Sequence, residues 1–321
     1  MMRIVRRIAV GLLTLIVVSL VFGAIYQRTA TAGAFDNYLP PGRFFAVGDH
    51  NLHITCSGSG RSVVLESGFG GWSIDWRGIQ PEIARFARVC SYDRSGLGWS
   101  ERGPASTTTR QGRARELHAL LRRASVPKPY VLVGHSLGGF FIREFARLYP
   151  KDVAGLVFVD SSHEEMGSRL TKQERDEAVG QLRLLRFGRY LMPFGIQRLL
   201  GLPVSNARDL PEDVRDEAEA IGYRSSSYFA LYDEASNLIR EEDEGSLKLG
   251  KIPNVPLTVL ASDENVRDIA VWKELQEELA GLTRDARFEI VAHSGHFIHV
   301  DQPEIVVSAI RHVLLRAKVR A

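Results

Sequence analysis

The segment best suited to chemistry is GHSLGG at residues 134–139, which places a serine at position 136 between glycines. It follows the apolar run Tyr130–Val133, which predicts a strand, and precedes a helical pattern that begins at Phe140. A serine in such a sharp strand-to-helix turn needs neighbours without side chains, and the turn holds its hydroxyl clear of the sheet. The helix start and the Leu137 amide add partial positive charge beside it. We therefore predict that Ser136 is a nucleophile.

A serine hydroxyl needs a base to take its proton, and nine histidines are available for that role. His296 lies in a loop after the last predicted strand, at the same carboxyl edge of the sheet as Ser136, where open α/β sheets bind ligands. Gly295 gives the backbone freedom beside His296, so we prefer it to His293 and His299 in the same loop. His135 is expected to point away from the serine. The remaining histidines have structural or unassigned interpretations: His50, His53, His118, His163 and His312.

The acid of a catalytic triad must reach His296 from the same edge and fix its tautomer. Two strand ends offer a carboxylate there. Asp160 follows the run Gly155–Val159, and Asp263 follows Leu257–Ala261. From position alone both remain candidates.

These residues need a scaffold, and the chain alternates short β-type runs with helical patterns from residue 43 onward. Several runs are continuous stretches of Val, Ile and Leu, which is typical of strands buried on both faces of a parallel sheet. The alternation predicts a doubly wound α/β sheet, with its core at 43–162 and 250–321. The predicted strands are Arg43–Val47, Leu52–Cys56, Ser62–Glu66, Arg88–Tyr92, Tyr130–Val133, Gly155–Val159, Leu257–Ala261 and Arg287–Val291.

Residues 163–249 interrupt this alternation with helical sequence and are predicted to form a cap over one end of the sheet. Within the cap, Leu182–Leu202 interleaves Leu, Phe and Met with four arginines. Packing against the main domain is the first interpretation of this segment. Lining an apolar substrate pocket and touching a membrane surface are the alternatives.

The N-terminal segment 1–26 contains a run without charge, from Ile8 to Tyr26, after three arginines. As a helix this run spans about 28 Å, close to the roughly 30 Å of a bilayer core. We favour an uncleaved anchor, with the catalytic domain outside the cytoplasm. A secreted protein is the alternative, because Ala30-Thr31-Ala32 fits a signal-peptide cleavage site. Residues 27–42, which are small, polar and proline-punctuated, are predicted to be a linker.

Charge and motifs exclude several classes of partner. Without the three N-terminal arginines, 38 of the 41 Lys and Arg residues remain against 38 Asp and Glu, so no basic field indicates a nucleic-acid partner. The sequence has no HExxH, no paired CxxC, no P-loop and no dinucleotide fingerprint, and we expect neither a metal nor a nucleotide cofactor. His50 and His53 are interpreted as structural. The two cysteines, Cys56 and Cys90, permit one disulfide in an exported protein.

Across residues 42–315 the sequence resembles the α/β-hydrolase superfamily, and in particular its bacterial members with an N-terminal hydrophobic segment. The motifs that carry the resemblance are LESGFGGWSIDW (65–76), CSYDRSGLGWSE (90–101), VLVGHSLGG (131–139), GLVFVDSSHEE (155–165) and SGHFIHVDQPE (294–304). It implies an eight-stranded, mostly parallel sheet with helices on both faces and a helical cap. It also implies the chain order Ser, acid, His, and an oxyanion hole formed by the Phe69 and Leu137 amides.

The resemblance also bears on the acid and on the cysteines. Many relatives carry the acid after the later strand, but Asn265 occupies that place here. VDSSHEE resembles relatives whose acid lies 24 residues after the nucleophile, as Asp160 does, so Asp160 is favoured and Asp263 kept as the alternative. The usual strand order makes the strands of Cys56 and Cys90 neighbours, which favours a disulfide.

Together these features predict a serine hydrolase that cleaves a small-molecule carboxylic ester with an apolar acyl or alcohol part. Related dehalogenases and epoxide hydrolases place an aspartate where Ser136 stands, so the resemblance argues against both chemistries. An aminopeptidase or amidase on the same triad is the first alternative. A catalytically inactive binding protein on the same fold is the second. The sequence assigns no oligomeric state.

Overall fold

A computed structural model describes residues 2–202, 204, 210–244 and 250–317, and within them eight strands form one sheet. The strand order is β1-β2-β4-β3-β5-β6-β7-β8. β2 runs antiparallel to both of its neighbours, whereas the strands from β4 to β8 are parallel. This confirms the predicted fold class. The strands are β1 (Arg43–Val47), β2 (His50–Ser57), β3 (Ser62–Glu66), β4 (Arg88–Tyr92), β5 (Tyr130–His135), β6 (Val153–Val159), β7 (Leu257–Ser262) and β8 (Ala286–Val291).

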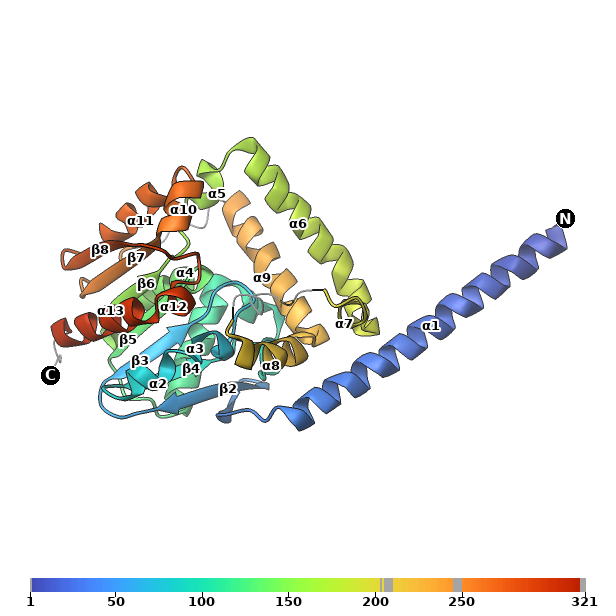
Figure 1. Cartoon of the computed structure of the whole chain (residues 1–321), viewed down its shortest axis with the longest axis horizontal. Helices are drawn as coiled ribbons and strands as arrows, with labels where there is room; N and C mark the ends of the chain where they lie inside the picture. Colours follow the sequence, from blue (N-terminus) through green and yellow to red (C-terminus); the bar gives the residue numbers. More distant parts are fainter. Residues whose placement is uncertain (1, 203, 205–209, 245–249, 318–321) are drawn as a thin grey trace.

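Helices cover both faces of the sheet because the central strands β3, β5 and β6 carry apolar side chains on each face (Figure 1). On one face α3, α4 and α11 bury residues such as Leu120, Phe145 and Leu279 against the sheet. On the other face α2 and α13 do the same with Ile83 and Ile310. The core helices are α2 (Gln80–Ala84), α3 (Arg110–Arg123), α4 (Leu137–Leu148), α10 (Asp263–Asp268), α11 (Trp272–Ala280), α12 (Ile298–Asp301) and α13 (Pro303–Arg316).

The insertion between β6 and β7 consists of helices and loops in its described part. Its longest helix, α6, begins with a capping box in which Thr171 and Glu174 satisfy each other's backbone amides. Residues 203, 205–209 and 245–249 of the predicted cap, like residues 318–321 of the predicted core, lie outside the described residues. The cap elements are α5 (Met166–Arg169), α6 (Lys172–Leu191), η4 (Met192–Phe194), α7 (Ile196–Leu199), α8 (Glu212–Gly222) and α9 (Ser225–Asp243).

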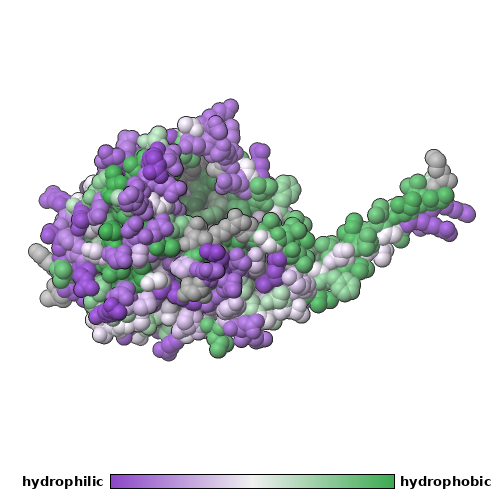
Figure 2. All heavy atoms as spheres, in the orientation of Figure 1, coloured by the Kyte–Doolittle hydropathy of each residue, from purple (hydrophilic) through white to green (hydrophobic). Residues whose placement is uncertain are grey.

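Among the described residues one helix, α1 (Met2–Asn37), is long and apolar enough to cross a membrane, and it projects from the body (Figures 1 and 2). Its last part corrects the prediction of a linker at 27–42, since the helix continues through residue 37. Gln27 donates a hydrogen bond to the Tyr223 carbonyl at 2.7 Å, and Ala34 is buried among cap and core residues. These tertiary contacts stabilise the helix, and its small residues allow the close packing. The helix ends shortly before Pro40, which could not have continued it.

Cys56 and Cys90 form a disulfide between β2 and β4, where they are paired residues in the antiparallel ladder. The bridge links residues 34 apart in the sequence. Cys90 is fully buried against the core cluster on one face of the sheet. The disulfide therefore fastens the antiparallel edge of the sheet to its parallel part.

Candidate active site

Ser136 is the one residue between the end of β5 and the start of α4, and its backbone has a φ of 51° and a ψ of −124°. A positive φ is strained for a residue with a side chain, and such strain clusters at functional sites. The turn is close-packed: a Cβ on Gly138 would lie 2.4 Å from the Glu66 carbonyl oxygen, and one on Gly134 would lie 2.6 Å from Gly139 Cα. Glycine is therefore required at both positions, and the elbow predicted from GHSLGG is present around Ser136.

His296 lies in the loop between β8 and α12, and this loop is attached to the elbow. The His135 imidazole, directly before the serine, donates from Nε2 to the His296 carbonyl oxygen at 2.9 Å. The two imidazole rings lie 4.6 Å apart between centroids. Gly295 donates its amide to Asp301 at 2.8 Å, which fixes the loop beside His296. His135 thus positions the loop, in a role that the sequence analysis did not assign.

Asp160 is fully buried at the end of β6 and contacts the His296 imidazole, with 2.7 Å between Asp160 Oδ2 and His296 Nδ1. Its backbone also has a positive φ, of 46°. Four further donors stabilise the carboxylate. They are the Ser262 amide at 2.9 Å, the Ser262 hydroxyl at 3.0 Å, Asn265 Nδ2 at 2.5 Å and the Trp272 indole at 2.7 Å. Because the carboxylate has this many partners, its orientation toward the imidazole is fixed.

The Asp263 carboxylate binds the backbone of the loop that carries His296. It accepts hydrogen bonds from the backbone amides of His293 and Ser294 at 2.9 and 3.0 Å. These two bonds hold the pKa of Asp263 below its usual value. Of the two predicted candidates, Asp160 is the carboxylate brought against His296, while Asp263 secures the loop that carries it. Asn265, in the place where the resemblance implies an acid in many relatives, lies 3.1 Å from His296 Nδ1 and also binds Asp160.

The two predicted oxyanion donors, the amides of Leu137 and Phe69, belong to the start of α4 and to the loop after β3. Leu137 is the first residue of α4, so its amide has no acceptor within the helix. Phe69 lies in the loop after β3, and the preceding Gly68 passes close to the serine. A Cβ on Gly68 would lie 3.1 Å from Ser136 Cβ. The Phe69 ring packs with an apolar cluster formed by Leu137, Phe140, Phe141 and Leu238.

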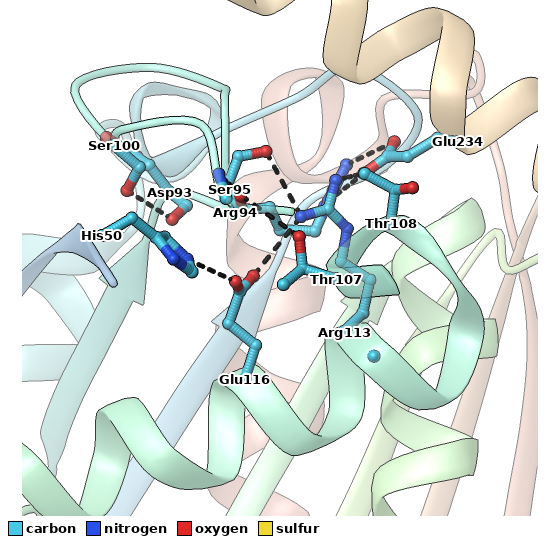
Figure 3. Close-up of polar contacts among 12 residues, drawn as sticks. His50, Asp93, Arg94, Ser95, Ser100, Thr107, Thr108, Arg113, Glu116 and Glu234 are labelled. Carbon is cyan, nitrogen blue, oxygen red and sulfur yellow. Dashed lines mark hydrogen bonds and ion pairs between the residues drawn. The ribbon is translucent and has the colours of Figure 1, made fainter. Parts of the chain in front are cut away.

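Arg94 fixes the loop that carries Phe69. Its guanidinium donates to the Ser67 carbonyl at 2.7 Å and to the Gly68 carbonyl at 2.6 Å. The same guanidinium pairs with Glu66 at 2.7 Å and with Glu234 of the cap at 2.8 Å. Figure 3 shows Arg94 and Arg113 directed toward Glu234, which descends from α9. One buried cation therefore connects the loop that carries Phe69, the end of β3 and α9.

The electrostatics of this network follow from its burial. Burial raises the pKa of Glu66, although the neighbouring Arg94 opposes the shift, and the Tyr92 hydroxyl donates to its carboxylate. Burial also acts to raise the pKa of Glu234, but the guanidinium groups of Arg94 and Arg113 outweigh it and keep that pKa below its usual value. Glu234 is therefore held as a carboxylate inside the protein.

Sequence reasoning missed several residues that support the site. Arg94 belongs to CSYDRSGLGWSE, one of the motifs that carry the family resemblance, so the sequence did contain a signal for this residue. Glu234 and Trp272 lie in ordinary helical sequence, which offers no such signal. His50 and His53, interpreted as structural, bind separate carboxylates, Glu116 at 2.7 Å and Asp93 at 3.0 Å. Among the described residues, no group of three or more His, Cys, Asp or Glu side chains could hold a metal ion.

The chain is similar to known proteins over most of its length. A family model described as the alpha/beta hydrolase fold matches residues 61–199. The uncharacterized protein YqjL of Bacillus subtilis is 26% identical over 79% of this chain and 84% of its own. An AB hydrolase superfamily protein of Gibberella zeae is 25% identical over 78% of this chain and 85% of its own. Among solved structures, a thermophilic esterase from Thermogutta terrifontis has a TM-score of 0.63 at 23% identity, covering 84% of this chain and 95% of that one.

The sheet topology, the elbow and the partial family match together show that this chain has the α/β-hydrolase fold. The resemblance drawn from the sequence motifs is thereby confirmed. The solved epoxide hydrolase CorEH has the same fold, with a TM-score of 0.70 at 17% identity, over 86% of this chain and 99% of that one.

Proposed function

We propose that this chain is a serine hydrolase that cleaves a carboxylic ester with an apolar acyl or alcohol part. The proposal depends above all on the 2.7 Å contact between Asp160 and His296, in a loop held by the residue before Ser136. A nucleophile, a base and a carboxylate thus gather at one edge of the sheet in the chain order Ser, Asp, His. This arrangement performs nucleophilic acyl transfer on unrelated scaffolds as well.

The proposed roles are those of a serine, histidine and aspartate triad. Asp160 accepts a hydrogen bond from Nδ1–H of His296, and this tautomer leaves Nε2 to take the proton of Ser136 as the hydroxyl attacks the ester carbonyl. The amides of Phe69 and Leu137 receive the negative charge on the carbonyl oxygen. His296 then protonates the leaving alcohol. In the second half-reaction it activates water, which releases the acid from Ser136.

The side chains around the serine support an apolar substrate. Phe69, Phe140, Phe141 and Leu238 cluster with Leu137 directly beside the elbow. The hollow between cap and core also has apolar walls in the space-filling view (Figure 2). The epoxide hydrolases among the structural neighbours share the fold, but the serine at 136 favours acyl transfer over the chemistry expected of an aspartate there.

A fluorophosphonate probe and a substrate panel test this function. We expect the probe to label the wild-type protein and to leave Ser136→Ala unlabelled. A panel of nitrophenyl esters of graded chain length, run beside aminoacyl arylamides, separates the reactions. Preference for the arylamides would replace the esterase with an amidase or aminopeptidase. A protein that neither reacts with the probe nor turns over any substrate would be a binding protein on this fold.

We further infer that α1 is retained as a membrane anchor, with the catalytic domain on the outer side. The contacts of Gln27 with Tyr223 and of Ala34 with the cap support retention, because cleavage after Ala32 would remove the first of them. The intact mass of protein purified from membranes tests this. A mass that begins at residue 33 would show a cleaved signal and a secreted enzyme. A C-terminal reporter active only in the cytoplasm would reverse the topology.

A further inference from the structure

The cap touches α1 at the end of the uncharged run. A Cβ on Gly23 would lie 2.6 Å from the Phe194 carbonyl oxygen, and one on Gly195 would lie 2.9 Å from the Tyr26 ring. Glycine on each side lets the helix and the η4–α7 turn approach closely. The cap and the apolar helix are therefore in contact at residues 23–26 of α1.

This contact sets the height of the cap relative to the bilayer. Ile8–Tyr26, the uncharged run, spans about 28 Å as a helix and is needed in full to cross roughly 30 Å of hydrocarbon. Gly23 and Tyr26 must then lie at the boundary of the hydrocarbon layer. Phe194 and Gly195, which touch them, lie at the same depth. The part of the cap that includes η4 and α7 is consequently at the membrane surface.

The same part of the cap exposes large apolar side chains. We define the cap edge as residues 183–202, which comprise the last turns of α6 together with η4 and α7. Single exposed apolar residues are ordinary on soluble proteins, but a concentration of them beside an apolar helix indicates an interaction surface. Figure 2 shows apolar surface continuing from α1 onto the adjoining body. The exposed members are Leu184 (72%), Phe187 (71%), Tyr190 (63%), Leu191 (47%), Leu199 (58%), Leu200 (66%) and Leu202 (43%).

The charge of the cap edge is of one sign. Its only charged residues are Arg183, Arg186, Arg189 and Arg198. The first half of α6 is mixed in charge, with Lys172 and Arg175 beside Glu174, Asp176 and Glu177. Arg189 lies over the Tyr232 ring at 4.9 Å, and Arg198 lies over the Tyr223 ring at 5.0 Å. Arginines interleaved with Leu, Phe and Tyr are typical of surfaces that lie in the headgroup layer and attract anionic lipids.

We propose that the cap edge docks on the bilayer crossed by α1, with its apolar side chains in the headgroup layer and its arginines on anionic lipid headgroups. The proposal rests on the anchor role proposed for α1, and it is independent of the reaction catalysed. Its consequence is mechanical. The protein lies against the membrane through two contacts, α1 and the cap edge, and so has one fixed orientation on the lipid surface.

Depth-dependent quenching tests the docking on the full chain. Both native cysteines form the disulfide, so a single introduced cysteine can be labelled selectively without reductant. Leu200→Cys and Phe187→Cys place a fluorophore on the cap edge. Leu315→Cys is the matched control, since Leu315 is 77% exposed on α13, away from α1 (Figure 1). Each variant is reconstituted into vesicles of phosphatidylcholine and phosphatidylglycerol that contain nitroxide-labelled lipid.

We expect the two cap-edge labels to be quenched at least about threefold more than the Leu315 label. Equal quenching at all three positions would overturn the docking. Changing Arg183 and Arg186 together to Gln should lower the quenching at Leu200, and so should vesicles of phosphatidylcholine alone. If neither the arginine substitutions nor the removal of anionic lipid changes the quenching, the arginines do not bind anionic headgroups and that part of the proposal is wrong.

Flotation of the same vesicles separates the two proposals. Protein that does not float with the vesicles contradicts the anchor itself. Protein that floats while its Leu200 label stays unquenched leaves the anchor intact and contradicts only the docking. Neither measurement uses catalytic turnover, so the ester-hydrolase proposal is tested separately.

Discussion

Arg94 and Glu234 meet inside the protein, with 2.8 Å between Arg94 Nε and Glu234 Oε1, although they are 140 residues apart in the sequence. Arg94 belongs to the loop after β4 and Glu234 to α9 of the cap. The same guanidinium donates to the carbonyls of Ser67 and Gly68, next to the proposed oxyanion donor Phe69. The conformation of the loop that carries Phe69, the proposed oxyanion loop, therefore depends on an ion pair made with α9.

Arg94→Lys should lower kcat while changing KM little. Lysine keeps the positive charge but cannot reproduce the forked donors that reach Ser67, Gly68 and Glu234 at once. Since loss of one oxyanion-hole donor costs about 10²–10³ in kcat, a displaced loop should cost up to a similar factor. Steady-state kinetics with a nitrophenyl ester measure it.

The matched control is Arg102→Lys, which changes an arginine that pairs with Asp233, the neighbour of Glu234, at the exposed surface. It should behave like the wild type, because exposed ion pairs contribute little. If Arg94→Lys folds and keeps its kcat, Arg94 does not position the oxyanion loop.

Replacing the acid distinguishes Asp160 from Asp263. Asp160→Asn keeps the shape but removes the charge that fixes the His296 tautomer, so kcat should fall by about 10⁴. Asp263→Asn should lose much less, because Asp263 binds backbone amides of the loop. The rates of the two purified variants are compared with the wild type at pH 7. An active Asp160→Asn beside an inactive Asp263→Asn would make Asp263 the acid.

Ser136→Ala should abolish nearly all turnover, by about 10⁵–10⁶-fold, while the protein stays folded. Alanine removes the nucleophile and leaves the glycine turn around it unchanged. Circular dichroism and melting temperature show whether the fold survives. Near-normal activity in a folded Ser136→Ala variant would exclude Ser136 as the nucleophile.

Local patterns account for what could be predicted of this site. The elbow is visible in sequence because strand, glycine, serine, glycine and helix are adjacent in the chain. His296 was singled out because it follows Gly295 in the loop after the last strand. For the acid, position in the sequence left both Asp160 and Asp263 as candidates, and only the family resemblance favoured Asp160.

Contacts between distant segments explain the rest. Nothing local marks Glu234 as the partner of Arg94, or Trp272 as a donor to Asp160. The helical state of residues 27–37 is another example, since their small and polar composition resembles a linker. They are helical because Gln27 and Ala34 pack against the cap and core. Tertiary packing routinely overrides weak local preference.

Removing the disulfide should lower the stability of the protein. Cys56→Ser together with Cys90→Ser opens a loop of 34 residues, which corresponds to roughly 3–4 kcal/mol in the chain-entropy model. Melting temperatures of the wild type, with and without reductant, and of the double variant measure the loss. Two alkylatable thiols in protein purified without reductant from an oxidising compartment would show that the bridge does not form.

Acid should destabilise the protein through its buried histidines. Burial lowers the pKa of His299 to about 3, and burial also holds the pKa of His135 well below its usual range. Below a pH of about 6.5 the unfolded chain binds protons at these imidazoles, whereas the folded chain does not, so the free energy of unfolding falls as the pH falls. His50 acts in the opposite direction, because its hydrogen bond to Glu116 raises its pKa. The contribution of His299 must therefore be isolated by substitution.

His299→Phe isolates that contribution because phenylalanine keeps the aromatic contact with Trp76, at 4.5 Å between ring centroids, and does not titrate. Neither ring nitrogen of His299 makes a hydrogen bond within the described residues, so none is lost. Between pH 7 and pH 5 the wild type should lose roughly 2 kcal/mol more of its free energy of unfolding than the variant. Denaturant unfolding in a mild detergent at both pH values measures this difference. Equal losses in the two proteins would mean that His299 takes up its proton in the folded state.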